Sequence, residues 1–131
     1  MKDIATKNIA SFLIAATVVV APAAVYGQSA TEITGTSGGS QTSAECGFVP
    51  AKPNYSFSIT EPASVSIEVS GADDYTLLMV GPDNSSSECI LAHDFDGGAI
   101  QSRGLYKPGT YHLYVGDIDG ASAPFTMTVQ Q

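Results

Sequence analysis

Positive charge is scarce in this chain of 131 residues. Five Lys and Arg side chains stand against 13 Asp and Glu, which gives a formal net charge of −8 at pH 7. Nucleic acids and anionic membrane surfaces repel a protein of this charge, so we expect neither as a partner. The acidity is typical of a protein that must stay soluble outside the cell, and cation binding is the second interpretation.

Helical periodicity and catalytic motifs are also lacking. Beyond residue 27 no window repeats its apolar residues at the spacing of an amphipathic helix, so the body of the fold is not expected to contain helices. No Gly-x-Ser-x-Gly segment is present to supply an activated serine. The two histidines, His93 and His112, belong to no catalytic motif. We therefore expect a protein that is not an enzyme.

Only two cysteines occur, Cys46 and Cys89. Two thiolates make a structural zinc site only with two further ligands such as matched histidines. In an oxidising compartment, two cysteines of one small domain usually pair. We expect a Cys46–Cys89 disulfide, whose loop of about 43 residues would stabilise the fold by ~3–4 kcal/mol through the unfolded chain.

The first 27 residues have the composition of a secretory signal peptide. They begin with basic residues, contain no charge from position 8 onward, and include an almost wholly apolar stretch, Ile9–Val20. We expect cleavage after Gly27 and export to the periplasm or the medium, with no membrane span left afterwards. An uncleaved anchor is the alternative, but the apolar stretch is near the lower limit of ~17–25 residues for a spanning helix and ends at Pro22.

Residues 28–45 consist mainly of Ser, Thr and Gly, with Ile33 as their one large apolar residue. A segment of this kind has no face to bury, and we expect a flexible spacer. The remaining residues, 46–131, suffice for one small domain.

Strict alternation of apolar and polar residues begins at Tyr55 and predicts strands with one buried side. Residues 75–80 (YTLLMV) are apolar on both sides and predict a central strand. The predicted strands comprise residues 55–60, 64–70, 75–80, 88–92, 100–105, 110–115 and 125–129. About seven to eight antiparallel strands at this spacing, separated by Gly, Pro and Asp turns, predict an all-β sandwich.

Several short motifs follow one another in this region. They are the alternating strand at 64–69, Gly81-Pro82-Asp83, Asp94-Phe95-Asp96-Gly97, and Pro108-Gly109-Thr110-Tyr111. Their order resembles that of the bacterial pre-peptidase C-terminal (PPC) domain, a jelly-roll-like β-sandwich appended to secreted proteases. The resemblance implies a non-catalytic accessory or binding module for a glycan, a protein or calcium. This chain departs from the family in having no peptidase domain beside it, so we expect a stand-alone secreted member. The alternative function is a partner, inhibitor or folding aid of a separately encoded secreted hydrolase.

Calcium is the one cofactor that the sequence suggests. Two Asp-x-Asp-Gly segments, 94–97 and 117–120, alternate carboxylates and end on a glycine that permits a sharp turn, and calcium prefers several oxygen ligands. Neither segment has the Glu at position twelve of an EF-hand loop. For both segments we favour ordinary turn residues, and less clearly for 94–97, whose acidic loop also has the family resemblance. The candidate ligands are Asp94, Asp96 and Asp74.

Three aromatic residues are the candidates for a binding surface. Tyr106, His112 and Tyr114 are predicted to point outward together, whereas alternation places Tyr55 and Tyr111 on the inward side. Such a patch could stack on sugar rings or pack on another protein. The expected partner is an extracellular protein or a polysaccharide.

Overall fold

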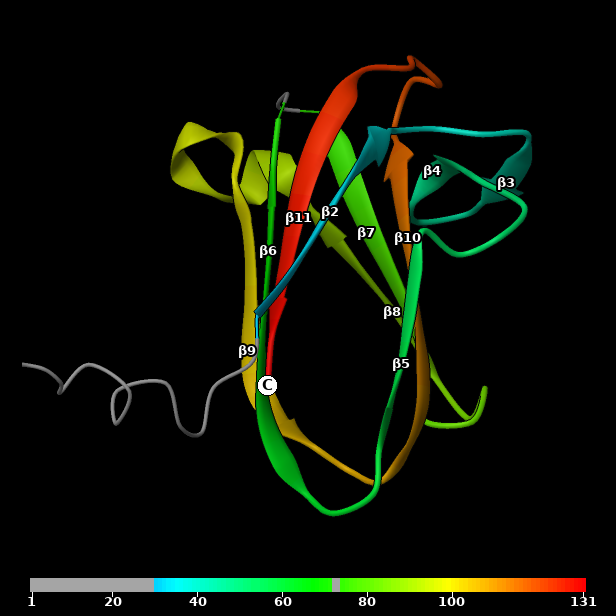
Figure 1. The fold of residues 1–131 in the computed structure, drawn as a ribbon. Helices are drawn as coiled ribbons and strands as arrows, with labels where there is room; N and C mark the ends of the chain where they lie inside the picture. Colours follow the sequence, from blue (N-terminus) through cyan, green and yellow to red (C-terminus); the bar gives the residue numbers. More distant parts are fainter. Residues whose placement is uncertain (1–29, 72–73) are drawn as a thin grey trace, which may run out of the picture.

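The computed structural model describes residues 30–71 and 74–131, so the predicted signal peptide lies outside the described residues (Figure 1). The described chain contains ten strands and two short 3-10 helices, which confirms the all-β prediction. Within these ranges no helix has the length and hydrophobicity needed to span a bilayer. The elements are β2 (Ala30–Thr36), β3 (Gln41–Ser43), β4 (Gly47–Val49), β5 (Tyr55–Ile59), β6 (Ala63–Ser70), β7 (Tyr75–Val80), β8 (Ser87–Leu91), η3 (Ala92–Asp94), η4 (Asp96–Gly98), β9 (Ile100–Tyr106), β10 (Gly109–Asp117) and β11 (Pro124–Gln130).

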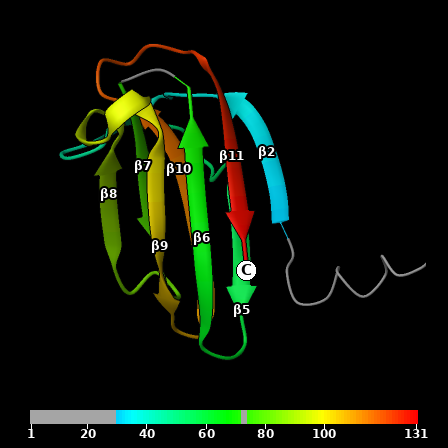
Figure 2. The ribbon, with the colours of Figure 1, turned by 90° about the vertical axis from the view of Figure 1, so that its left-hand side faces the viewer.

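Two antiparallel sheets pack face to face. The four-stranded sheet has the order β2-β11-β6-β9. The six-stranded sheet has the order β3-β4-β10-β7-β8, and β5 joins it by pairing with β10. Figure 2 shows β8 and β9 as the edge strands of the two sheets on one side of the sandwich, with β2 at the other side.

The core lies between the sheets and consists of the inward members of the alternating strands. Val65, Ile67 and Val69 face inward from β6, and every second residue of β7, β10 and β11 does the same. Burying each such side chain contributes about 1.5–3 kcal/mol. Tyr111 stacks on Phe57 with ring centroids 5.3 Å apart. The inward placement of Tyr111 and of the partly buried Tyr55 is thereby confirmed.

The prediction of a flexible spacer over residues 28–45 is wrong for its described part. All seven residues of β2 pair with β11, and β3 pairs with β4. The reason is that an edge strand needs only one half-buried side and a neighbour that supplies hydrogen bonds. Ile33 packs against the core, and the absence of a side chain at Gly35 leaves room for the Phe125 ring. The folded domain therefore includes residues 30–45.

Candidate functional site

The outer side of the six-stranded sheet presents an uncharged surface, which we call the Tyr114 face. Strands β5, β10 and β7 build it side by side, because residues opposite one another on paired strands point to the same side. Across these strands Tyr114 lies opposite Leu78, and His112 lies between Ser56 and Val80. The face comprises Ser56, Ser58, Leu78, Val80, Thr110, His112 and Tyr114.

One half of the Tyr114 face is polar and held by hydrogen bonds. The Ser56 hydroxyl lies 2.6 Å from Nδ1 of His112, and the Ser58 hydroxyl lies 3.0 Å from that of Thr110. The contact with Ser56 restrains the His112 ring. The half formed by Tyr114, Leu78 and Val80 is apolar and half-buried. The apolar half can therefore pack against an apolar group of a partner. The neighbouring hydroxyl and imidazole groups can form hydrogen bonds with polar groups of the same partner.

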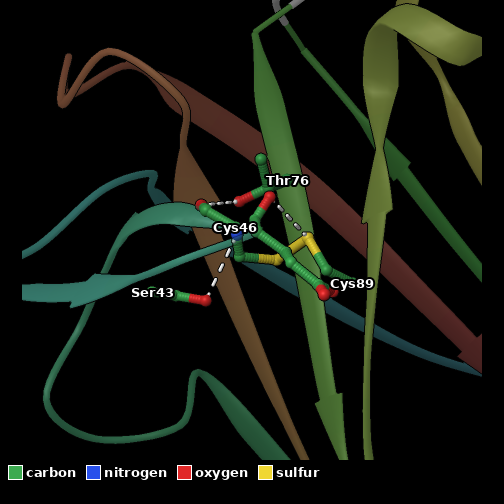
Figure 3. The surroundings of a disulfide bond; sticks show 5 residues. Ser43, Cys46, Thr76 and Cys89 are labelled. Atoms are coloured by element: carbon green, nitrogen blue, oxygen red, sulfur yellow. Dashed lines mark hydrogen bonds between the residues drawn. A yellow bond between two sulfur atoms is a disulfide. The ribbon is translucent and has the colours of Figure 1, made fainter.

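The β3–β4 hairpin borders the Tyr114 face, and the disulfide attaches it to the sheet. Cys46, in the turn of the hairpin, is bonded to Cys89 of β8 with a Cα–Cα distance of 5.6 Å, which confirms the predicted pairing. Figure 3 shows Thr76 and Ser43 beside Cys46. The Thr76 hydroxyl donates to the Cys46 carbonyl at 2.8 Å, and the Cys46 N–H donates to the Ser43 hydroxyl at 3.2 Å.

Gly116 allows the hairpin to lie directly on β10. A Cβ at this position would be 2.5 Å from the carbonyl oxygen of Phe48 and 2.6 Å from the hydroxyl oxygen of Thr76. Both distances are shorter than real Cβ contacts, so any larger residue would push the hairpin away. The glycine therefore helps to set the boundary of the Tyr114 face.

The structure brings His112 and Tyr114 together but separates Tyr106 from them, so the predicted three-residue patch is wrong for Tyr106. This residue lies on β9 of the other sheet and faces the core, with its ring centroid 5.0 Å from that of Tyr111. The inward positions of β9 include Ser102 and Gly104, and these small residues hide the alternation that would have placed Tyr106 correctly.

Sequence reasoning missed Leu78 and Val80 as members of the face. The segment 75–80 was predicted as a central strand, and β7 does lie between β10 and β8. Of its outward side chains, Thr76 is buried beneath the hairpin, whereas Leu78 and Val80 are only half-buried. The sequence does contain a signal for these two residues, because the segment 75–80 is apolar on its outward side as well as on its inward side.

The candidate calcium ligands are only partly described. Asp117 is 2% exposed, and its Oδ1 accepts the N–H groups of Asp119 and Ala121 at 2.9 and 3.1 Å, which supports its interpretation as a turn residue. Asp74 is exposed, and Asp94 ends η3. The side chain of Asp96 lies outside the described residues. Among the side chains that are described, no three Asp, Glu, His or Cys gather as metal ligands, and calcium binding stays a prediction.

The two packed antiparallel sheets form a β-sandwich whose fold is similar to those of two solved structures. The chain is similar to the pre-peptidase C-terminal domain of a collagenase from Bacillus anthracis, with a TM-score of 0.55, 20% identity, and coverage of 76% of this chain and 87% of that domain. It is also similar to Aeromonas hydrophila PliG, a periplasmic inhibitor of g-type lysozyme, with a TM-score of 0.50, 14% identity, and coverage of 87% and 93%. The PPC resemblance is thereby confirmed for the fold.

Sequence similarity places the chain more narrowly. It is 30% identical over 103 residues to an uncharacterized protein of Synechococcus elongatus, Synpcc7942_2126, covering 75% of this chain and 73% of that protein. The chain belongs to the family of this Synechococcus protein. No family model matches the chain.

Proposed function

We propose that the chain is an exported, non-catalytic accessory module that binds an extracellular protein or polysaccharide through the Tyr114 face. The observation that carries the proposal is the distribution of charge. The protein has a net charge of −8, yet none of the seven residues of the Tyr114 face is Asp, Glu, Lys or Arg. Solubility alone gives no reason to keep one sheet face free of charge.

An uncharged face with an aromatic residue is suited to association. Burying a charge against a partner is costly unless the partner neutralises it, and the centres of interfaces are depleted in charged residues and enriched in Tyr. A Tyr side chain also offers a large contact area with few rotatable bonds. Around Tyr114, the restrained His112 ring and the Ser and Thr hydroxyls add hydrogen-bonding groups for a neutral partner.

One observation and one expectation from the sequence support export. Disulfides persist in oxidising compartments, and the Cys46–Cys89 bond is formed in the structure. The expected signal peptide of residues 1–27 would deliver the chain to such a compartment. Detection of the protein in a periplasmic or medium fraction, beginning at residue 28, would test this part of the proposal.

The first experiment compares two double variants on opposite faces. Tyr114→Ala/His112→Ala removes the centre of the Tyr114 face, and Thr126→Ala/Thr128→Ala is the control on the other sheet. Binding is measured to insoluble cellulose, chitin and peptidoglycan and to secreted proteins from the source cells. We expect the first variant to weaken binding at least about tenfold, as for residues at the centre of an interface, and the control to bind normally. Unchanged binding to every candidate would refute the proposal.

Inhibition of a secreted hydrolase is the second candidate function. PliG, whose fold is similar, is an inhibitor of g-type lysozyme. The other similar structure is a pre-peptidase C-terminal domain, so neither is a catalytic domain. The assay is the rate of peptidoglycan hydrolysis by a g-type lysozyme with and without this protein. An unchanged rate at a large excess of the protein would eliminate this candidate for that enzyme class.

A further inference from the structure

The strands β8 and β9 are the edge strands of different sheets and lie on the same side of the sandwich (Figure 2). A cavity of about 410 Å³ lies there, near the end of the molecule where β9 turns into β10. Its volume falls within the ~300–1,000 Å³ typical of small-molecule sites. We call it the β8–β9 cavity, and its lining includes Met79, Glu88, Ser102, Arg103, Tyr106 and Lys107.

Polar and small residues occupy inward positions at this edge. Glu88 lies opposite the buried Met79, and Ser102 and Gly104 lie opposite the buried Ile67 and Val65, so all three face the space between the sheets. The inward positions of β6, β7 and β11 are apolar. At this edge Glu88 and Gly104 are exposed and Ser102 is half-buried, so a carboxylate, a hydroxyl and a glycine line the space between the sheets without filling it.

Tyr106 forms part of the wall, and its hydroxyl interacts with both Met79 and Ser102. Its hydroxyl donates to Sδ of Met79 at 3.0 Å, and a thioether is a poor acceptor. Burial raises the pKa of Tyr106 above its ordinary value of 10.0, while the hydroxyl of Ser102 opposes that shift and the charge of Glu88 adds to it. The phenol therefore remains a donor at neutral pH and could turn to a stronger acceptor on a ligand.

The charges around the β8–β9 cavity are of both signs and lie on different strands. The described chain contains three basic residues, Lys52, Arg103 and Lys107, and two of them line this one cavity. Both lie on or directly after β9, whereas Glu88 belongs to β8. Arg103 lies opposite Ser66 and starts from the outer side of the sheet, so Lys107 and Glu88 are the opposite charges that face the cavity. Together they favour a ligand that has both charges.

We propose that the β8–β9 cavity binds a small zwitterion of the α-amino-acid class. Its ammonium group pairs with Glu88 and its carboxylate with Lys107, while an apolar side chain lies on Met79 and the Tyr106 ring. A phosphate or other polyanion is disfavoured because Glu88 would repel it. A purely apolar ligand is disfavoured because it would leave the charged groups without partners. The proposal is independent of the Tyr114 face.

The test is a titration of the intact protein with L-leucine, followed by NMR of methyl-labelled methionines. Met79 lines the cavity, and Met127, which is fully buried on β11, is an internal control. We expect a saturable shift of the Met79 signal and none of Met127. N-acetyl-leucine amide has the same side chain without either charge, and we expect no saturable shift with it.

Charge variants show whether the walls are used as proposed. Charge-assisted hydrogen bonds are roughly twice as strong as neutral ones, so Glu88→Gln and Lys107→Gln should each weaken leucine binding about fivefold or more. Glu32→Gln and Lys52→Gln make the same charge changes at exposed residues that do not line the cavity. We expect these controls to bind like the unchanged protein, and all four variants to keep its unfolding temperature.

Three results would overturn the proposal. The first is the lack of any saturable Met79 shift up to about 50 mM leucine, beyond even weak millimolar affinity. The second is an equal response to the uncharged amide, which would indicate a merely apolar contact. The third is an equal loss of binding in the control variants, which would indicate an effect of net charge and no use of Glu88 or Lys107.

Discussion

The two outer faces of the sandwich are built by the same alternation of residues, yet they differ in charge. Glu32, Glu68 and Arg103 lie on the outer side of the four-stranded sheet among Ser, Thr and Gln, and Gln101 donates to Glu68 there at 3.3 Å. The Tyr114 face has no such residue and is bordered by a hairpin held by the disulfide. Alternation determines which side chains point outward, and the difference in charge indicates which outward side is suited to a partner.

The disulfide should account for the largest difference between the two faces. Cys46→Ala/Cys89→Ala releases the hairpin beside the Tyr114 face and relaxes the unfolded chain, and we expect it to lower the free energy of unfolding by about 3–4 kcal/mol. Chemical denaturation with and without reductant measures the loss. The unchanged protein in reductant is the matched control, because it loses the same bond without a substitution. A loss below about 1 kcal/mol would mean that the hairpin stays in place without the bond.

A calcium site would change the interpretation of the acidic residues outside the Tyr114 face. If Asp94 and Asp96, with Asp74, hold calcium, a concentration 100 times the dissociation constant raises the free energy of unfolding by about 2.7 kcal/mol. Thermal unfolding in calcium and in chelator measures this rise, and Asp94→Asn should reduce it. Asp119→Asn, in the second Asp-x-Asp-Gly loop, is the control. Identical unfolding temperatures in calcium and in chelator would mean that these acidic residues bind no calcium and serve solubility.

Two glycines provide a comparison between the sheets at the level of single residues. Gly116→Ala places a methyl group 2.5 Å from the Phe48 carbonyl oxygen under the hairpin, and overpacking of this kind costs about 1–3 kcal/mol. Gly104→Ala on β9 places its methyl group 3.7 Å from the Tyr106 ring, which is an ordinary van der Waals distance. We expect it to change stability by less than about 0.5 kcal/mol. Equal effects in chemical denaturation would show that the hairpin does not press on β10.

Much of the fold could be predicted because the alternation in the central strands is local. Residues 55–59, 75–80 and 125–129 need only their own pattern to reveal a strand and its buried side. The strand β2 could not be found in this way, since its Ser, Thr and Gly composition is also that of a linker. Its hydrogen bonds come from β11, which lies about ninety residues later in the chain.

The candidate site was predictable to the same extent. His112 and Tyr114 share one strand, so their spacing of two residues places them on one side. Predicting where the Tyr106 side chain points requires knowing which sheet contains β9, and no local sequence pattern supplies this information. The hairpin over Gly116 and the cavity between β8 and β9 also depend on packing between distant segments.

The smallest expected effect on stability is the sharpest test of the difference between the faces. Ser58→Glu and Ser64→Glu exchange exposed serines on outward sides of the two sheets and make the same change in net charge. Each should alter the free energy of unfolding by less than about 0.5 kcal/mol, because exposed substitutions rarely do more. The two variants should differ in binding, because only Ser58→Glu buries a new charge against a partner. We expect Ser58→Glu to bind the partner at least about tenfold more weakly than Ser64→Glu does. Equal retention of the two variants, both folded, would mean that the uncharged character of the Tyr114 face does not serve recognition.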